Sequence, residues 1–269
     1  MLVSVVIPAR NDAAMLERAL TALAAQTRPA DEIVVVDNDS SDDTAAVAAA
    51  GGARVVREEA HGIPQAASTG YDAASGRLIA RIDADTVCPP EWVARIIADF
   101  EADPQLDVVS GAAEFYGAGR VTRRLGKAWW IGGMYWSMTA YLGHPPVFGS
   151  NFVMRREIWA QLRTEVHRTT RTIHDDLDLS LHMKPWMTVR YDPELTVGIS
   201  ARPFATVRGL ARRVGWVVPT LMNHWPEDSP WNRREARRRW QSERSLRPEP
   251  VAEWQPPAEE DGDEREAIA

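Results

Sequence analysis

Short β-branched runs alternate with helix-forming segments through the first 115 residues, and this alternation constrains the fold more than any other feature. The runs lie at residues 2–7, 33–36, 54–57 and 78–82. Apolar residues at helical spacing, or alanine-rich sequence, fill the segments between them. A parallel strand pair needs a crossover connection, usually a helix, so this order is typical of a parallel sheet covered on both faces. The sequence therefore predicts an α/β fold with a doubly wound, mostly parallel sheet.

The pattern continues less regularly in the second half of the chain. A helix is expected from Pro90, followed by a strand at residues 106–115. Residues 125–142 are rich in Trp, Met and Gly and are expected to be helical. Further short strands are expected at residues 152–154, 188–191 and 196–199.

Charge is segregated at the C-terminal end. Residues 208–247 contain ten arginines and four acidic residues, whereas residues 249–269 contain eight acidic residues and one arginine. The formal net charge is −7, so the tail accounts for it and the rest of the chain is near neutral. We expect a basic helical extension at residues 206–247. Because Pro, Glu and Asp dominate residues 248–269, that tail is expected to be disordered.

Cysteine usage and hydropathy bear on the compartment. Cys88 is the single cysteine, which excludes an intrachain disulfide and a cysteine-based zinc site and fits a reducing cytosol. The N-terminal residues 1–7 resemble a strand and not a signal peptide. No stretch reaches the roughly 18 apolar residues that a spanning helix needs. A cytoplasmic protein is therefore expected.

Acidic residues follow two of the expected strands. Asp83 and Asp85 come after the strand at 78–82, and Asp37 comes directly after the strand at 33–36. An isolated Asp-x-Asp is more often a solvated turn. The carboxyl ends of parallel strands, however, lie at one edge of a sheet, where ligands bind. Carboxylate oxygens there suit Mg²⁺ or Mn²⁺ on a nucleoside diphosphate.

Four stretches together resemble glycosyltransferase family 2, whose members have the GT-A fold. They are residues 3–11 (VSVVIPARN), 32–44 (EIVVVDNDSSDDT), 82–85 (IDAD) and 175–179 (DDLDL). The resemblance implies a nucleotide-sugar-binding half at 1–115 and an acceptor-binding and catalytic-base half at 116–205 of the same domain. It also implies a small acceptor-side subregion beside the sheet.

The resemblance implies roles for individual residues. Those assigned to nucleotide binding are Pro8, Ala9, Arg10, Asn11, Asp37, Asp39, Arg81 and Asp83. Those assigned to the metal are Asp85 and Asp83. His224 is a further candidate, although a lone histidine is more often structural. Asp176 takes the place of the catalytic base, paired with Asp175 where the family usually has Glu. Those assigned to the acceptor side are Gly149, Asn151 and His174.

The implied reaction is the metal-assisted, inverting transfer of a sugar from a nucleoside-diphosphate sugar to an acceptor hydroxyl. UDP is the favoured nucleotide, and a lipid-linked acceptor is one alternative. The family's arginine is missing from Ala66 to Gly70, where the sequence is AASTG, and Arg81 is the candidate replacement. The Gln-x-x-Arg-Trp sequence of processive members is absent, which favours transfer of a single sugar.

Other functions remain as alternatives at this stage. Residues 83–86 (DADT) are also close to the Asp-x-Asp-x-Thr of haloacid-dehalogenase-type phosphatases, although that motif follows the first strand of its domain. A nucleotidyltransferase would need a Gly-rich phosphate loop, which is absent. A catalytically silent sugar-nucleotide-binding protein is the third alternative.

Two segments bear on membrane contact. Residues 129–142 and 231–247 are candidates for peripheral association at the inner face of the plasma membrane, through aromatic and basic side chains respectively. A core or cleft-wall helix is the alternative for the first, and a solvated helix for the second. No nucleic-acid-binding module surrounds the arginines, so nucleic acid is not an expected partner.

Overall fold

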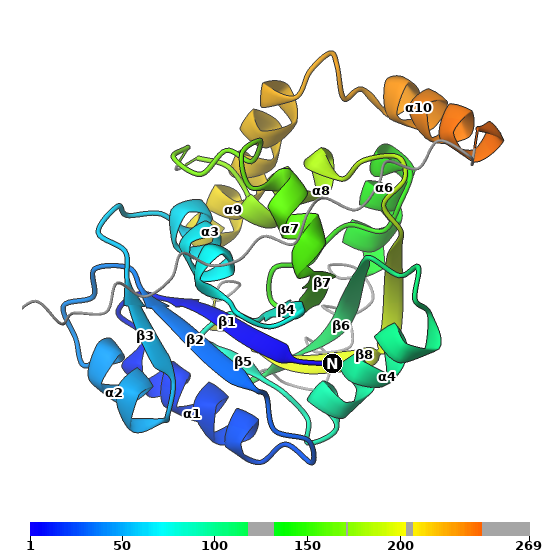
Figure 1. Cartoon of the computed structure of the whole chain (residues 1–269). Helices are drawn as coiled ribbons and strands as arrows, with labels where there is room; N and C mark the ends of the chain where they lie inside the picture. The colour runs from blue at the N-terminus through cyan, green and yellow to red at the C-terminus, as the bar shows by residue number, and fades with distance from the viewer. Residues whose placement is uncertain (118–131, 171, 203–206, 244–269) are drawn as a thin grey trace, which may run out of the picture.

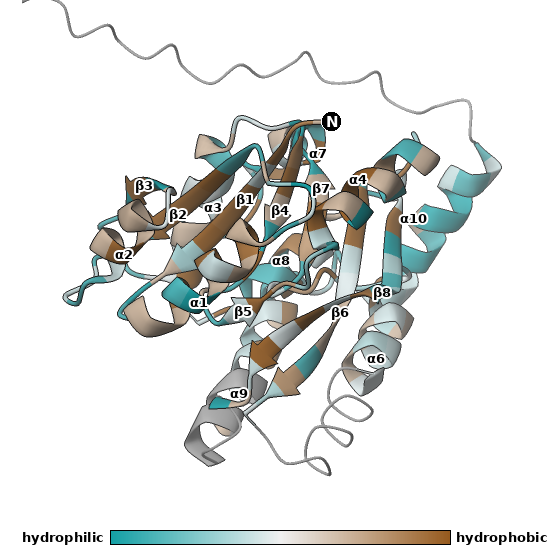
Figure 2. Cartoon of the chain, turned by 90° about the horizontal axis from the view of Figure 1, so that it is seen from below, coloured by the Kyte–Doolittle hydropathy of each residue, from teal (hydrophilic) through white to brown (hydrophobic). Residues whose placement is uncertain are grey.

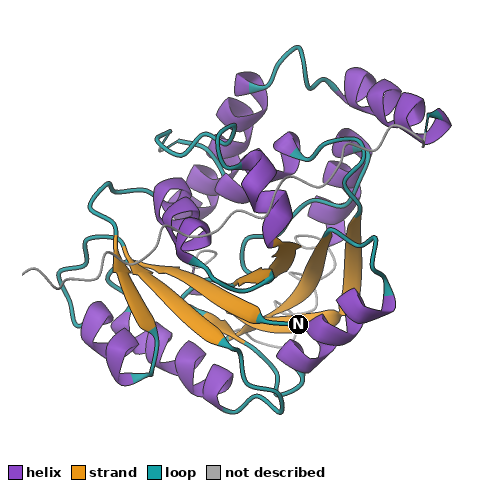
Figure 3. Ribbon diagram, in the orientation of Figure 1, coloured by secondary structure: helices purple, strands orange, loops and turns teal. Residues whose placement is uncertain are grey.

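A computed structural model describes residues 1–117, 132–170, 172–202 and 207–243, with the side chains of 207–210 and 212–214 excepted. These residues form an eight-stranded sheet with helices on both faces (Figures 1 and 3). The predicted α/β class is confirmed. The strands are β1 (Val3–Ala9), β2 (Glu32–Asp37), β3 (Arg54–Arg57), β4 (Leu78–Arg81), β5 (Thr86–Val87), β6 (Val108–Tyr116), β7 (Phe152–Arg155) and β8 (Val189–Ser200). The helices are α1 (Ala13–Ala24), α2 (Thr44–Ala50), α3 (Ile63–Ala73), α4 (Trp92–Ala102), α6 (Gly133–Leu142), α7 (Arg156–Leu162), α8 (Asp175–His182), α9 (Val207–Asn223) and α10 (Pro230–Ser242).

Strands β1, β2 and β4 are buried on both faces, as their apolar runs require, whereas the edge strand β3 is only partly buried. Successive side chains of a strand point to opposite faces. Val5 and Ile7 of β1 therefore join a core with α1 and α4, whereas Val6 joins a second core with α3 and α7. Figure 2 shows much of β1, β2 and β4 in brown, the colour of hydrophobic residues. The two cores hold β1 to β4 in a fixed orientation.

The sheet is mixed, because the order is β3-β2-β1-β4-β7-β6-β8-β5. Four strand pairings are parallel and three are antiparallel. Strand β7 runs antiparallel between β4 and β6. The two strands expected at 188–191 and 196–199 are one strand, β8, which pairs with β6 across a register shift at Gly111. Asp83 and Asp85 lie in the loop between β4 and β5.

The two segments with membrane candidates adopt helices over the residues described. In α6, Tyr135 is buried and donates a hydrogen bond to the carbonyl of Gly111, while Trp136 is 78% exposed. The expected helix residues 125–131, residues 206 and 244–247 of the expected basic extension, and the tail 248–269 lie outside the described residues. In α10, Arg233 is buried and donates hydrogen bonds to the carbonyls of Leu142 and Leu181. None of the helices in the described part of the chain is long and apolar enough to cross a bilayer.

Candidate active site

The loops that carry the predicted acids meet at one edge of the sheet because of strand register. Ala9, the last residue of β1, pairs with Asp37, the last residue of β2. Arg81, the last residue of β4, pairs with Val6 of β1 and with Phe152 at the start of the antiparallel β7. The segment before β7 therefore reaches the end of β4. This edge gathers backbone from the start, the middle and the second half of the chain.

Arg81 lies at the centre of this edge. Its side chain is almost fully buried, and its guanidinium forms ion pairs with Asp83 at 3.0 Å and with Asp175 at 2.7 Å. The hydroxyl of Ser150 donates a hydrogen bond of 2.6 Å to the other carboxylate oxygen of Asp83. Asp83 of the β4–β5 loop and Asp175 of α8 are thus held on either side of one arginine.

Asp176, the residue predicted to be the base, is held by backbone donors. The N–H of Gly149 donates to Oδ2 at 2.9 Å, and the N–H of Leu177 donates to Oδ1 at 2.8 Å. A Cβ added at Gly149 would lie 2.5 Å from a terminal nitrogen of Arg81 and 3.1 Å from Oδ2 of Asp176. Glycine at this position therefore allows α8 and Arg81 to approach the same stretch of backbone.

Asp175 has a different electrostatic environment from an exposed carboxylate. Burial raises its pKa, the ion pair with Arg81 lowers it, and the negative charges of Asp176 and Asp83 raise it, so that the net value is about 6. The charge of Asp175 is therefore sensitive to pH just below neutrality.

The predicted nucleotide residues of β1 and β2 are ordered by local contacts. The backbone N–H of Ser40 donates to Asp37, and the backbone N–H of Ser41 donates to Asn11. Asn11 and Asp39 both have a positive φ, at 50° and 56°, a conformation that asparagine and aspartate tolerate in tight turns. These bonds tie the loop after β1 to the loop after β2.

His61 adds a side chain that sequence reasoning missed at this edge. Its Nε2 lies 2.6 Å from Asp39 and 3.4 Å from a terminal nitrogen of Arg10. The hydrogen bond from His61 lowers the pKa of Asp39. Arg10 and Asp39, both predicted to bind the nucleotide, thus meet at one imidazole on the exposed surface.

Asp85 is surrounded by groups that the sequence did not indicate. The hydroxyl of Tyr116, at the end of β6, donates a 2.6 Å hydrogen bond to the Asp85 carbonyl. Arg202, just after β8, lies 3.7 Å from the Asp85 carboxylate and 2.9 Å from both carboxylate oxygens of Asp12. The guanidinium shows that positive charge is accommodated next to Asp85. The sequence signal for Arg202 is its position at the end of the last strand.

Two predicted roles need correction. Asn151 is fully buried, and its amide donates to the carbonyls of Ala112 and Leu195 and accepts from the indole N–H of Trp92. It therefore connects β7 to β6, β8 and α4, and does not face an acceptor. Both ring nitrogens of His224 are directed to Asp178 and Asp228, at 2.9 and 3.1 Å, so His224 does not join Asp83 and Asp85 at a metal.

His174 lies next to the predicted base, at the N-terminal end of α8. Its backbone N–H donates to the hydroxyl of Thr220, and its ring packs 5.9 Å from that of Trp216. His174 thus fixes the start of α8 against α9. Its acceptor role stays a prediction.

Comparison with known proteins gives a match at the level of family. The sequence model of a family described as Glycosyl transferase family 2 matches residues 4–163, more than half of the chain. No curated protein sequence matches the chain significantly.

Solved structures resemble the fold. TarS 1–349 from S. aureus in complex with UDP-GlcNAc has a TM-score of 0.59 at 16% identity, over 75% of this chain and 59% of the TarS chain. Glucosyl-3-phosphoglycerate synthase from Mycobacterium tuberculosis, with Mn²⁺, UDP and phosphoglyceric acid, has a TM-score of 0.57 at 23% identity, over 82% of this chain and 78% of the synthase chain. Mannosyltransferase PcManGT from Pyrobaculum calidifontis, with GDP-Man and Mn²⁺, has a TM-score of 0.59 at 18% identity, over 91% of this chain and 76% of the mannosyltransferase chain. The chain spans about three fifths of the TarS chain, and at these identities the likeness shows the fold.

Proposed function

The chain belongs to glycosyl transferase family 2 and is a glycosyltransferase, and from this premise we propose that it transfers a single sugar with inversion. The donor is a nucleoside-diphosphate sugar, the acceptor group is a hydroxyl, and Asp176 is the general base. The observation that carries this proposal is the position of Arg81, which bridges Asp83 of the nucleotide loop and Asp175 of the catalytic helix. A donor bound near Asp83 would therefore lie next to Asp176, the base, which follows Asp175 on the same helix.

The chemistry proposed for the chain's own residues is proton removal and charge positioning. A carboxylate oxygen of Asp176 would accept the proton of the acceptor hydroxyl as its oxygen attacks the anomeric carbon and the bond to the diphosphate breaks. A single displacement from the opposite face inverts the anomeric centre. The backbone N–H groups of Gly149 and Leu177 support this role because they fix the orientation of the carboxylate.

The donor set of the β4–β5 loop fits a hard divalent cation. Asp83 and Asp85 would hold Mg²⁺ or Mn²⁺, because both offer carboxylate oxygens. Such an ion, when bound, supplies Lewis-acid stabilisation of the leaving diphosphate. Arg81, charged and buried, would orient Asp83 for that task.

The nucleotide site is proposed at the joined loops after β1 and β2. Pro8, Ala9 and Asn11 would line the base pocket, and Asp37 would accept a hydrogen bond from the base. Asp39 and Arg10 would lie at its rim with His61. UDP is the favoured nucleotide. The halves 1–115 and 116–205 would then supply donor and acceptor sites within one sheet, with Gly149 and His174 on the acceptor side.

The setting proposed for the enzyme is cytoplasmic, with peripheral contact at the inner face of the plasma membrane. The exposed Trp136 of α6 and the exposed arginines of α10 support such a contact. A lipid-linked acceptor would be consistent with it.

The experiment that tests the base is Asp176→Asn. We expect turnover to fall about 10²- to 10⁴-fold, as is typical for loss of a general base, while the affinity for the nucleotide, measured by calorimetry, is retained. The control is Glu101→Gln, which changes an exposed acid on α4. Wild-type turnover by Asp176→Asn would refute the assignment. Retention of the donor's anomeric configuration, followed by NMR of the product, would refute inversion.

A further inference from the structure

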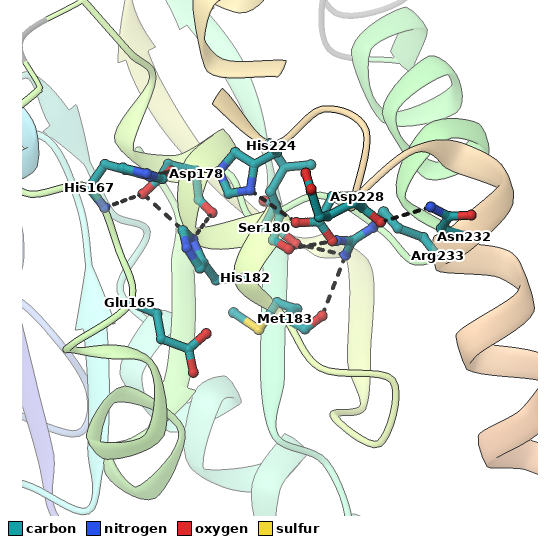
Figure 4. Close-up of polar contacts among 12 residues, drawn as sticks. Glu165, His167, Asp178, Ser180, His182, Met183, His224, Asp228, Asn232 and Arg233 are labelled. Atoms are coloured by element: carbon teal, nitrogen blue, oxygen red, sulfur yellow. Dashed lines mark hydrogen bonds and ion pairs between the residues drawn. The ribbon is translucent and has the colours of Figure 1, made fainter. Parts of the chain in front are cut away.

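Three of the chain's six histidines converge around Asp178 of α8, and none of the four residues has a part in the proposed sugar transfer. His167 lies in the loop after α7, His182 ends α8, and His224 follows α9. Their ring centroids lie 4.7 to 5.4 Å apart. Asp178, one turn before His182 on α8, lies among them (Figure 4). One ligand atom from each of these four residues lies within 4.8 Å of the other three.

The contacts of His182 leave a lone pair for a metal, and Asp228 offers His224 an outer partner. Nδ1 of His182 lies 2.9 Å from the carbonyl of Asp178, so a neutral ring donates there and keeps Nε2 as the lone-pair nitrogen. Nδ1 of His224 lies 3.1 Å from Asp228, and its Nε2 lies 2.9 Å from Asp178. A carbonyl or carboxylate that binds the second nitrogen of a ligating histidine is the usual outer contact of protein metal sites.

The dimensions and access of the cluster also fit a metal. Ligand bonds of about 2.0–2.2 Å around a tetrahedral ion place ligand atoms roughly 3.3 Å apart. Nδ1 of His167 lies 2.7 Å and Nε2 of His224 lies 2.9 Å from Oδ1 of Asp178, so small shifts would accommodate an ion. A cavity of about 210 Å³, lined in part by His182 and Asp228, adjoins the cluster and provides an entry path.

The donor set selects the kind of ion. Three imidazoles and one carboxylate favour Zn²⁺ over Mg²⁺, which prefers oxygen ligands, and over Mn²⁺, which lies at the weak end of the affinity series for such sites. Four protein ligands complete a tetrahedron and leave no open position, which is the arrangement of structural zinc.

We propose that His167, Asp178, His182 and His224 bind a structural Zn²⁺, with Asp228 as the outer partner of His224. The ion joins the loop after α7, the helix α8 and the end of α9. Asp178 lies two residues after Asp176 on α8, so the zinc anchors the helix that carries the proposed base. This site is independent of the cation proposed at Asp83 and Asp85, and its existence does not depend on the proposed reaction.

A hydrogen-bond network without metal is the alternative. It requires His224 to carry protons on both nitrogens, because that ring would donate to Asp178 and to Asp228 at once. The two arrangements differ in metal content, which can be measured directly.

The first test is metal analysis of the full chain, made without a histidine tag, loaded with equimolar Zn²⁺ and desalted. We expect about one zinc per chain by mass spectrometry. Replacement by Co²⁺ should give the intense visible bands of a tetrahedral site. Chelation should lower Tm, and Zn²⁺ should restore it where Mg²⁺ does not. A chain that retains no zinc, or a cobalt spectrum without those bands, would refute the proposal and leave the hydrogen-bond network.

Variants locate the ion. His182→Gln and His224→Gln should each lose the zinc, whereas His61→Gln, a histidine outside the cluster, should keep it. Asp85→Asn should also keep it, which separates this site from the proposed diphosphate cation. If the cluster variants retain zinc at the level of His61→Gln, the assignment is wrong. The analysis of the unaltered chain remains decisive if those variants do not fold.

Discussion

At the scale of single residues, Gly149 shows how little space surrounds the proposed base. Its N–H donates to Asp176, while the Arg81 guanidinium occupies the space that a Cβ would need. The constraint at this position comes from close approach of two charged groups, because its φ lies outside the positive range. The residue therefore has a positioning role.

Gly149→Ala should reduce kcat about 10- to 100-fold, because displacement of a reacting group by about 1 Å has effects of that size. Steady-state kinetics with an excess of donor would measure it. The matched control is Gly133→Ala on α6, where an added Cβ meets nothing within 4 Å; its kcat should be that of the unaltered enzyme. Equal kcat for both variants would contradict the packing argument.

Asp175 makes stability depend on pH in a direction that follows from its pKa. The folded value of about 6 lies above the ordinary value of 3.8. Its contribution to the free energy of unfolding is therefore fully present below about pH 4 and is lost as pH rises through about 6. Asp175→Asn removes this titration.

The stability difference between the unaltered chain and Asp175→Asn should thus fall by about 1 kcal/mol from about pH 5 to about pH 7. Urea unfolding of both chains at the two pH values would measure it. An unchanged difference, or one that grows with pH, would show that Asp175 is ionised across this range in the folded state.

At the scale of elements, Asn151 connects parts of the sheet that are far apart in sequence. Its amide bonds the carbonyls of Ala112 on β6 and Leu195 on β8, and Trp92 of α4 donates to it. It lies directly before β7, so these bonds also fix the segment that carries Gly149 and Ser150.

Asn151→Ala should lower the free energy of unfolding by about 2–4 kcal/mol, because it leaves buried carbonyls and an indole N–H without their partner. Urea unfolding should show a lower midpoint with an unchanged slope. Asn223→Ala, at an exposed asparagine on α9, should stay within about 0.5 kcal/mol. If Asn151→Ala also lowers the free energy of unfolding by no more than about 0.5 kcal/mol, water must replace the hydrogen bonds that Asn151 made.

The elements that sequence predicted are those whose pattern is local. β1 to β4 and their helices follow from apolar runs and helical spacing within a few residues of each other. Strand β7 between β4 and β6, the two-residue strand β5, and the continuity of β8 depend on pairing between distant segments. No periodicity within one segment carries that information, so the mixed sheet was only partly predictable.

The same distinction applies to the site. The acids at 37, 83, 85, 175 and 176 are found from motifs, because they follow strands or begin a helix. The buried role of Asn151 was missed because the sequence does not show in which direction the residue directly before β7 points. The histidine cluster draws on positions 167, 182 and 224, and its one local signal is the spacing of Asp178 and His182 by one helical turn.

At the scale of the whole molecule, α10 combines one buried arginine with several exposed ones. Arg233 is fixed by the carbonyls of Leu142 and Leu181 and by an ion pair with Asp228 at 2.8 Å. Arg234, Arg238 and Arg239 are exposed. Trp225 and Trp231 nearby are 48% and 69% exposed, with ring centroids 6.5 Å apart. Basic and aromatic side chains on one surface are typical of contact with an anionic bilayer.

Neutralising these three exposed arginines to glutamine tests that contact without disturbing Arg233. Each basic residue near an anionic surface contributes about 1 kcal/mol, so the triple variant should bind vesicles of anionic lipid on the order of 100-fold more weakly. Flotation at low ionic strength would measure this, and salt should weaken the unaltered chain in the same way because it screens the attraction. The control neutralises Arg18, Arg57 and Arg77, which are exposed elsewhere, and should float as the unaltered chain does. Equal flotation of both triple variants would exclude α10 as the membrane contact, and failure of all three proteins to float would exclude the contact itself.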